Sequence, residues 1–180
     1  AEGSEVIVER YVRGDEHRLL IVGGKMVAAA KGESLWITGN GRDTVARLIE
    51  DQLNSDPRRG DAEEFPLETI VLEREPAMRV LVQRNGNVAI DCTDDVHPDI
   101  AYLASLAARV VGLDIAGIDL VVEDIAKPLA PQRGAVVEVN AGPGLLMHLK
   151  PAEGLPRPVG QAIVDNLFDE DETGRVPIIG

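Results

Sequence analysis

Two apolar segments of the sequence each contain an acidic side chain. Residues 116–122 carry Asp119, and residues 136–140 carry Glu138 and Asn140. Both segments have the composition of β-strands, and residues two apart in a strand project from the same face. If the two strands are neighbours, Asp119 joins Glu138 and Asn140 in a cluster of oxygen ligands. Mg²⁺ prefers such hard oxygen ligands, with its remaining positions filled by water and phosphate.

The same spacing also fits polar residues on the open face of a half-exposed sheet. The next four residues, 141–144, read Ala-Gly-Pro-Gly. Glycines directly after a polar strand end allow a ligand or another backbone to approach closely. This favours a metal site, although spacing alone leaves both interpretations open.

Composition limits the classes of function. The chain has 180 residues, 44% of them hydrophobic, which fits one soluble globular domain. Its net charge of −13 argues against nucleic acid as a partner. No apolar run approaches the roughly 20 residues that cross a bilayer, so no membrane association is expected. The single cysteine, Cys92, fits a reducing compartment, and we expect a cytoplasmic protein.

Strands and helices alternate irregularly along the chain, which predicts an α+β fold. The Gly23-Gly24 pair predicts a tight hairpin. A helix that starts near Pro98 and ends at Gly112 should bury a stripe from Ile100 to Val110. Further helices are expected over residues 44–53 and 159–168. Strands are expected over residues 6–9, 19–22, 25–30, 69–72, 80–83, 88–90, 118–122 and 135–139.

Residues 137–144, preceded by Gly-Ile-Asp at 117–119, resemble the ATP-grasp signature. In that family the matching Asp, Glu and Asn bind the magnesium ions that bridge the ATP phosphates. The resemblance therefore implies Asp119, Glu138 and Asn140 as metal ligands, and ATP and Mg²⁺ as cofactors. It also implies the C-terminal subdomain of an ATP-grasp domain, a mainly antiparallel sheet packed on helices.

Residues 8–16 are similar to the adenine-binding hinge of the same family. By resemblance, the backbone around residues 10–12 bonds the adenine edge, and an acidic side chain at the end of the segment bonds the ribose hydroxyls. The nucleotide-binding residues implied are Glu9, Arg10, Tyr11, Val12 and Glu16.

Two arginines are implied near the phosphates. Arg18 matches a position that faces the phosphates in related peptide ligases. Arg84 opens a segment that resembles the start of a longer Ser/Thr/Gly-rich loop, but here the chain passes almost directly to residues 88–91. Either the loop is deleted, or a mobile stretch is missing from the sequence. Residues 57–90 as a whole are expected to form a connecting, lid-like region.

An ordered set of further stretches resembles cyanophycin synthetases over nearly the whole chain. It includes residues 54–60, 91–99, 112–119, 147–149, 156–159 and 174–178. The resemblance implies an ATP-dependent carboxylate–amine ligase that adds aspartate to the backbone of cyanophycin, an Asp-Arg polymer, through an acyl phosphate. Two alternatives remain open. One is another ATP-grasp amino-acid ligase, such as a glutathione-synthetase-like or glutamate ligase, and the other is a non-catalytic scaffold.

The resemblance also implies partners. Besides ATP, these are aspartate and a cyanophycin primer as substrates. The chain, residues 1–180, is expected to be the C-terminal part of an ATP-grasp domain within a longer homo-oligomeric protein. An N-terminal ATP-grasp half and a Mur-ligase-like domain would belong to the remainder of that protein. The isolated part is expected to be inactive.

Two histidines have ambiguous roles. His97, before Pro98, is expected to start a helix, with catalysis as the alternative. His148 lies just past the Gly-Pro-Gly segment, where it could approach a substrate or serve an ordinary packing role.

Overall fold

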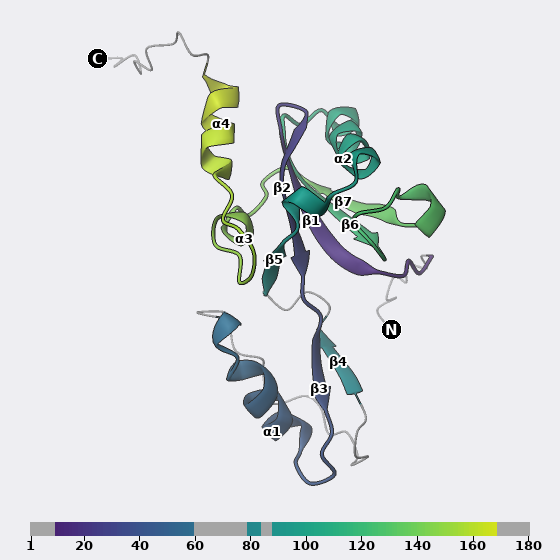
Figure 1. Cartoon of the computed structure of the whole chain (residues 1–180), viewed down its shortest axis with the longest axis vertical. Coiled ribbons are helices and arrows are strands. Elements are labelled where there is room, and N and C mark those ends of the chain that lie inside the picture. Colours follow the sequence, from purple (N-terminus) through teal and green to yellow (C-terminus); the bar gives the residue numbers. More distant parts are fainter. Residues whose placement is uncertain (1–9, 60–78, 84–87, 169–180) are drawn as a thin grey trace, which may run out of the picture.

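The computed structural model describes residues 10–59, 79–83 and 88–168 of the chain. Within these ranges the strands form a five-stranded and a two-stranded sheet, and every pairing between named strands is antiparallel. Figure 1 shows the larger sheet with α2, α3 and α4 in the upper part of the molecule, and β3, β4 and α1 below it. The predicted α+β class, with a mainly antiparallel sheet packed on helices, is confirmed.

The large sheet has the strand order β5-β2-β1-β6-β7. Each of its strands overlaps a segment that the sequence predicts as a strand. Their bounds are β1 (Asp15–Val22), β2 (Lys25–Gly32), β5 (Ala89–Asp91), β6 (Ile115–Val122) and β7 (Ala135–Asn140).

The hairpin predicted at Gly23 and Gly24 joins β1 to β2. Both glycines have positive φ angles, 56° and 73°, which a two-residue turn of type I′ requires. Val22 pairs with Lys25 across this turn, so the turn fixes the register at the end of the two central strands.

Helices cover both faces of the large sheet. Leu19 and Ile21 of β1 pack in a core with α2 (Pro98–Val111). Leu20 and Val22 point to the other face and pack with Val159 of α4 (Val159–Leu167). The one-turn helix α3 (Leu146–Leu149) lies against β2 and β5. Adjacent residues of a strand point to opposite faces, so the continuous apolar run of β1 supplies two cores.

Helix α2 begins and ends where the sequence predicts. The ring of His97 accepts a hydrogen bond from the backbone N–H of Asp99, so His97 caps the helix, as expected for a helix-start residue. Gly112 ends it with a φ angle of 81°, in the left-handed region that glycine tolerates. Val110 is 78% exposed, and the buried stripe runs instead through Ile100, Ala104 and Ala108.

The smaller part packs its sheet on one helix. Strand β3 (Leu35–Thr38), which the sequence analysis does not predict, pairs with β4 (Arg79–Gln83). Helix α1 (Val45–Ile49) is capped by Thr44 and continues as a π-helical turn (Glu50–Asn54). The core between them consists of Leu35, Ile37, Val45, Leu48, Ile49, Leu53 and Val88.

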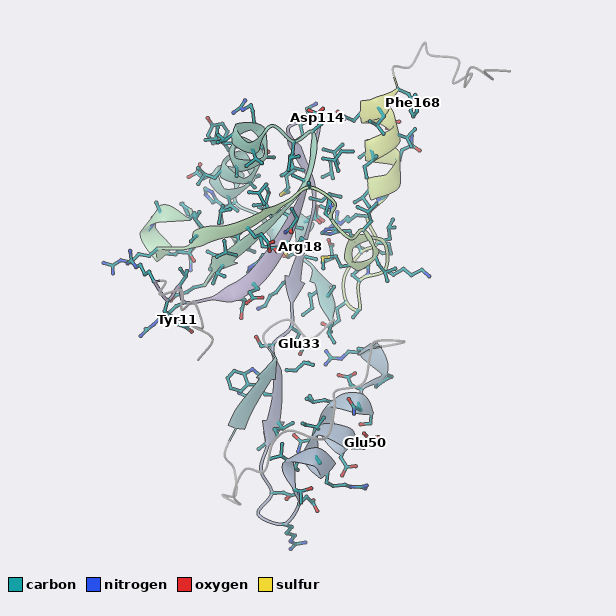
Figure 2. All side chains as sticks on the ribbon, turned by 180° about the vertical axis from the view of Figure 1, so that it is seen from behind. Tyr11, Arg18, Glu33, Glu50, Asp114 and Phe168 are labelled. Atoms are coloured by element: carbon teal, nitrogen blue, oxygen red, sulfur yellow. The ribbon has the colours of Figure 1, made fainter. Side chains whose placement is uncertain are left out.

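Passages of the chain and ion pairs join the smaller part to the larger. The chain passes from β2 into β3 through only Glu33 and Ser34, and it returns from β4 to β5. Arg58, in a 3₁₀ turn (Pro57–Arg59), forms ion pairs with Glu33 at 3.0 Å and with Glu153 beyond α3 at 2.8 Å. Figure 2 shows Glu33 at the junction of the two parts.

Some expectations fall outside the described ranges. These are the strands at residues 6–9 and 69–72, and most of the lid-like region 57–90. Within that region, residues 79–83 form β4 and residues 89–91 lie in β5. Of the helices that the structure describes, none has the length and apolar character of a membrane span.

Candidate functional site

A row of side chains crosses the large sheet from edge to edge. Asp91 of β5 pairs with Ala30 of β2, Ala30 with Arg18 of β1, Arg18 with Asp119 of β6, and Asp119 with Glu138 of β7. Directly opposed residues of antiparallel strands project from the same face. Because Arg18 alternates with Leu19, this face is the one covered by α3 and α4. The row therefore places one cation between carboxylates on a single face.

Arg18 and Asp119 form a bidentate ion pair at the centre of the row. Nε of Arg18 donates to Oδ1 of Asp119 at 2.6 Å, and Nη2 donates to Oδ2 at 2.5 Å. The Asp119 carboxylate raises the pKa of Arg18, and the charge of Glu138 acts in the same direction. Both side chains of the pair are partly exposed, at 26% and 21%. In Figure 2, Arg18 lies in the middle of the upper part of the molecule.

Asn140 completes the predicted trio. Its Nδ2 donates to Oδ2 of Asp119 at 3.1 Å, and it pairs across the sheet with Gly117. A Cβ on Gly117 would lie 2.8 Å from the Cβ of Pro143, so the Gly-Pro-Gly segment crosses β6 in close contact with this glycine. The sequence analysis quotes Gly117 in the signature but assigns it no role. Its signal was a glycine inside an apolar strand.

Asp91, at the β5 end of the row, is held by Arg157. Nε of Arg157 lies 3.0 Å from both carboxylate oxygens of Asp91, and Nη2 lies 2.5 Å from Oδ2. Burial opposes ionisation of Asp91, but hydrogen bonds from Arg157 and Thr93 lower its pKa to about 2. This pair ties the segment after α3 to the sheet edge, a role the sequence analysis missed.

His148 of α3 lies near the same row. It is 2% exposed, and the charges of Arg18 and Asp91 both act on its ring. Burial first, and then the Arg18 cation, lower the pKa of His148 to about 4. The ring is therefore neutral at pH 7.

The residues implied in nucleotide binding divide into two groups. Glu16 lies two residues before Arg18 in β1, so it shares the face of the row. Arg10, Tyr11 and Val12 precede the strand, and Figure 2 shows Tyr11 at the far end of β1, away from Arg18. Arg10 and Tyr11 are exposed.

Glu9 and Arg84 lie outside the described residues. Their roles stay predictions, as do those of the other candidate site residues.

The donor set of the trio fits magnesium. Asp119, Glu138 and Asn140 offer two carboxylates and an amide oxygen, all hard ligands, on a partly exposed face. Within the described ranges no group of three His, Cys, Asp or Glu side chains is placed to hold a metal. A site with three protein ligands therefore needs the side-chain oxygen of Asn140 as its third ligand. Asp119 is paired with Arg18, and the amide nitrogen of Asn140 faces Asp119. A cation at these oxygens therefore requires Arg18 to move and the Asn140 amide to turn.

The sequences of several known proteins align with nearly the whole chain. It is 41% identical to cyanophycin synthetase of Nostoc sp. over 97% of its length, and 42% identical to that of Synechocystis sp. over 99%. It is 32% identical to a glutathione biosynthesis bifunctional protein of Mannheimia succiniciproducens over 94%. The chain spans 22%, 23% and 25% of the length of these three proteins, respectively.

A solved structure supports the same relationship. The crystal structure of a bifunctional glutathione synthetase from Pasteurella multocida matches 88% of this chain with a TM-score of 0.62 and 26% identity, and the match covers 24% of that protein. No protein-family model matches the chain.

Proposed function

Because this chain is similar to the ATP-grasp region of cyanophycin synthetases over nearly its whole length, we propose that it is the nucleotide- and magnesium-binding part of an ATP-dependent carboxylate–amine ligase. The substrates we propose are aspartate and the growing cyanophycin backbone. The reaction has two steps. A substrate carboxylate oxygen takes the γ-phosphoryl group of ATP, releasing ADP, and the resulting acyl phosphate is attacked by an amine. Phosphate leaves, the amine loses a proton to solvent, and an amide bond is formed.

The observation that carries this proposal is the charged row on the partly exposed face of the large sheet. Phosphoryl transfer needs little covalent chemistry from the protein, because positioning and charge stabilisation do most of the work. Asp119, Glu138 and Asn140 would hold Mg²⁺, which when bound neutralises the charge of the transferring phosphoryl group. Arg18, which lies 2.5–2.6 Å from the Asp119 carboxylate oxygens, would supply a second positive group for the phosphates.

The nucleotide would extend along β1 from this row. Glu16 shares the face of Arg18 and precedes it by two residues, roughly 7 Å along a strand. Residues 10–12 precede the strand and lie outside it. An elongated ligand with its phosphates at Arg18 would thus have its ribose near Glu16 and its base beyond the strand. Glu9 and Arg84 are proposed contacts from the sequence resemblance alone.

The test compares phosphate release by the full-length wild type and by its variants in the presence of Mg²⁺–ATP, aspartate and a cyanophycin primer. Asp119→Ala and Glu138→Ala should each lower the rate at least 100-fold, since each removes a ligand of the metal that carries the transition-state charge. Glu123→Ala is the matched control, because Glu123 is an exposed acid just beyond the same strand, and its rate should stay within twofold.

The outcomes separate the parts of the proposal. Activity that survives both substitutions would refute the metal assignment. A wild-type protein that ignores aspartate and primer but responds to other amino-acid or peptide substrates would be a different ATP-grasp ligase, an alternative that the 32% identity to the glutathione biosynthesis protein favours. A wild-type protein that binds no Mg²⁺–ATP would be a scaffold.

We also propose a cytoplasmic, homo-oligomeric enzyme. The single cysteine, Cys92, is buried and unpaired, and burial raises the pKa of its thiol to about 12, so it is protonated and unreactive at pH 7. The oligomeric state rests on the relationship to cyanophycin synthetases and is tested by light scattering on the full-length protein.

A further inference from the structure

His148 is a buried polar side chain that makes no side-chain hydrogen bond to the described residues. Its exposure is 2%, and neither Nδ1 nor Nε2 has a partner among the residues that the structure describes. Leaving a buried donor or acceptor unsatisfied costs about 1–3 kcal/mol for each group. An ordinary packing position would be filled more favourably by an apolar side chain of similar size.

The other buried histidine shows what a packing histidine looks like in this chain. His17 of β1 is 4% exposed, and its Nδ1 lies 2.9 Å from the backbone oxygen of Asp15. It alternates with Arg18, so it points to the opposite face of the sheet from the row. Of the two buried histidines, His148 is therefore the one on the side of the candidate site.

The surroundings of His148 place it between Arg18, at the centre of the charged row, and Asp91, at its β5 end. Helix α3 contacts β2 and β5, and the charges of both Arg18 and Asp91 act on the imidazole ring of His148. In the row these two residues are separated by Ala30, the smallest member. Hydrogen bonds from Arg157 and Thr93 already occupy the carboxylate of Asp91. Arg18 is paired with Asp119, which is a proposed metal ligand. Of the two charged residues near His148, Arg18 is therefore the one that belongs to the candidate site.

The neutral state of the ring defines what it can bind. A neutral imidazole has one N–H donor and one nitrogen acceptor. Its lowered pKa makes it a weak proton acceptor, so the ring is suited to orienting a ligand rather than to general base catalysis. An amino-acid or peptide end carries matching groups, a carboxylate that accepts and an N–H that donates.

We propose that His148 is a substrate-contacting residue. Its ring N–H donates to a carboxylate oxygen of the amino-acid or peptide substrate next to Arg18, and its second nitrogen accepts an N–H of the same substrate. Helix α3 is a single turn, and its residues Leu146 and Leu149 are 67% and 40% exposed, so the buried ring lies close to the molecular surface. The inference rests on the proposed function and adds to it a residue that binds the amino-acid or peptide substrate rather than the nucleotide.

The test uses His148→Phe, His148→Gln and the control His17→Phe in the full-length protein. His148→Phe removes both polar groups, whereas the Gln amide retains a donor and an acceptor. We expect His148→Phe to raise KM for aspartate or primer about 10- to 100-fold, the loss of one or two hydrogen bonds, and to keep Mg²⁺–ATP affinity within twofold. Its melting temperature should equal or exceed that of the wild type. His148→Gln should restore part of the KM, and His17→Phe should lower the melting temperature and leave KM unchanged.

Calorimetric binding of L-aspartate and of a cyanophycin primer, with a non-hydrolysable ATP analogue present, separates this inference from the proposed function. If the wild type binds neither substrate, both are overturned. If the wild type binds them and His148→Phe binds them equally well, His148 is a packing residue and only this inference is overturned. A His148→Phe variant that loses Mg²⁺–ATP affinity would also overturn it, because the residue would then serve the nucleotide.

Discussion

Replacing Gly117 with alanine tests how closely the Gly-Pro-Gly segment is seated on the sheet. The added Cβ would lie 2.8 Å from the Cβ of Pro143, and 3.7 Å from both Cδ of Arg18 and Cβ of Asn140. Non-bonded carbon atoms are most stable about 3.5–4.0 Å apart. Only the contact with Pro143 is too short, and the atom concerned belongs to a rigid ring. The proline must therefore move by about 1 Å, taking its neighbours with it.

The cost follows from overpacking a close contact. Adding a methyl group to a filled site destabilises a protein by about 1–3 kcal/mol. For a unit of this size each kcal/mol lowers the melting temperature by about 2–4 °C. We therefore expect Gly117→Ala to melt about 2–12 °C lower than the wild type. Because Asn140 and Pro143 are three residues apart, the shift should also weaken Mg²⁺ binding.

The assay is a double-mutant cycle read by thermal unfolding and by Mg²⁺ titration. Pro143→Gly removes the Cβ that Gly117→Ala meets, so the double variant should be less destabilised than the sum of the single variants. Gly142→Ala is the control, since a Cβ there has nothing within 4 Å, and its melting temperature should be close to that of the wild type. Strict additivity of the cycle, or a Gly117→Ala variant as stable as the control, would refute this account of the contact.

Two further predictions concern buried ionisable groups. Asp91→Asn should destabilise the protein by about 1–3 kcal/mol in chemical unfolding, because it removes the more buried of the two carboxylates that hold Arg157, while Asp94 stays paired with the guanidinium at 2.8 Å; a loss below about 0.5 kcal/mol would contradict it. For His148, the pKa in the folded protein, about 4, lies below its ordinary value of 6.5, so the unfolded chain binds the proton more readily between these values. The stability that neutral His148 permits above pH 6.5 is therefore lost as the pH falls towards 4, by about 3 kcal/mol, and His148→Phe should lose less stability over this range when unfolding is followed at each pH.

The fold was largely predictable where elements are long. The central strands, α2 and α4 have enough residues to show their periodicity, and the glycines at 23, 24 and 112 mark turns and ends that only glycine adopts easily. Strand β3 and helix α3 have four residues each, too few for a period to be recognised. The predicted burial of Val110 was wrong, because the buried stripe runs through Ala104 and Ala108, and alanines mark a stripe less clearly than large apolar side chains.

The candidate site was predictable in part for the same reason. The i, i+2 spacing of Glu138 and Asn140 places them on one face, and β6 and β7 are neighbours, as the metal hypothesis assumed. The direct pairing of Arg18 with Asp119 depends on the register between β1 and β6, strands far apart in the sequence. Local patterns contain no such information. The Asp91–Arg157 pair joins a strand to a loop, and it likewise becomes visible only in three dimensions.

The covalent and the ionic attachments between the two parts of the molecule differ in their sensitivity to salt. The passage from β2 to β3 is covalent, whereas Arg58 holds Glu153 through partly exposed side chains, 38% and 50% exposed. Mobile ions screen exposed charges over about 8 Å at physiological ionic strength and over about 3 Å at 1 M salt. Rising salt therefore weakens the ion pairs of Arg58 with Glu33 and Glu153 and leaves the covalent passages intact. Ionic strength thus controls how tightly the segment after α1 is held against the larger part of the molecule.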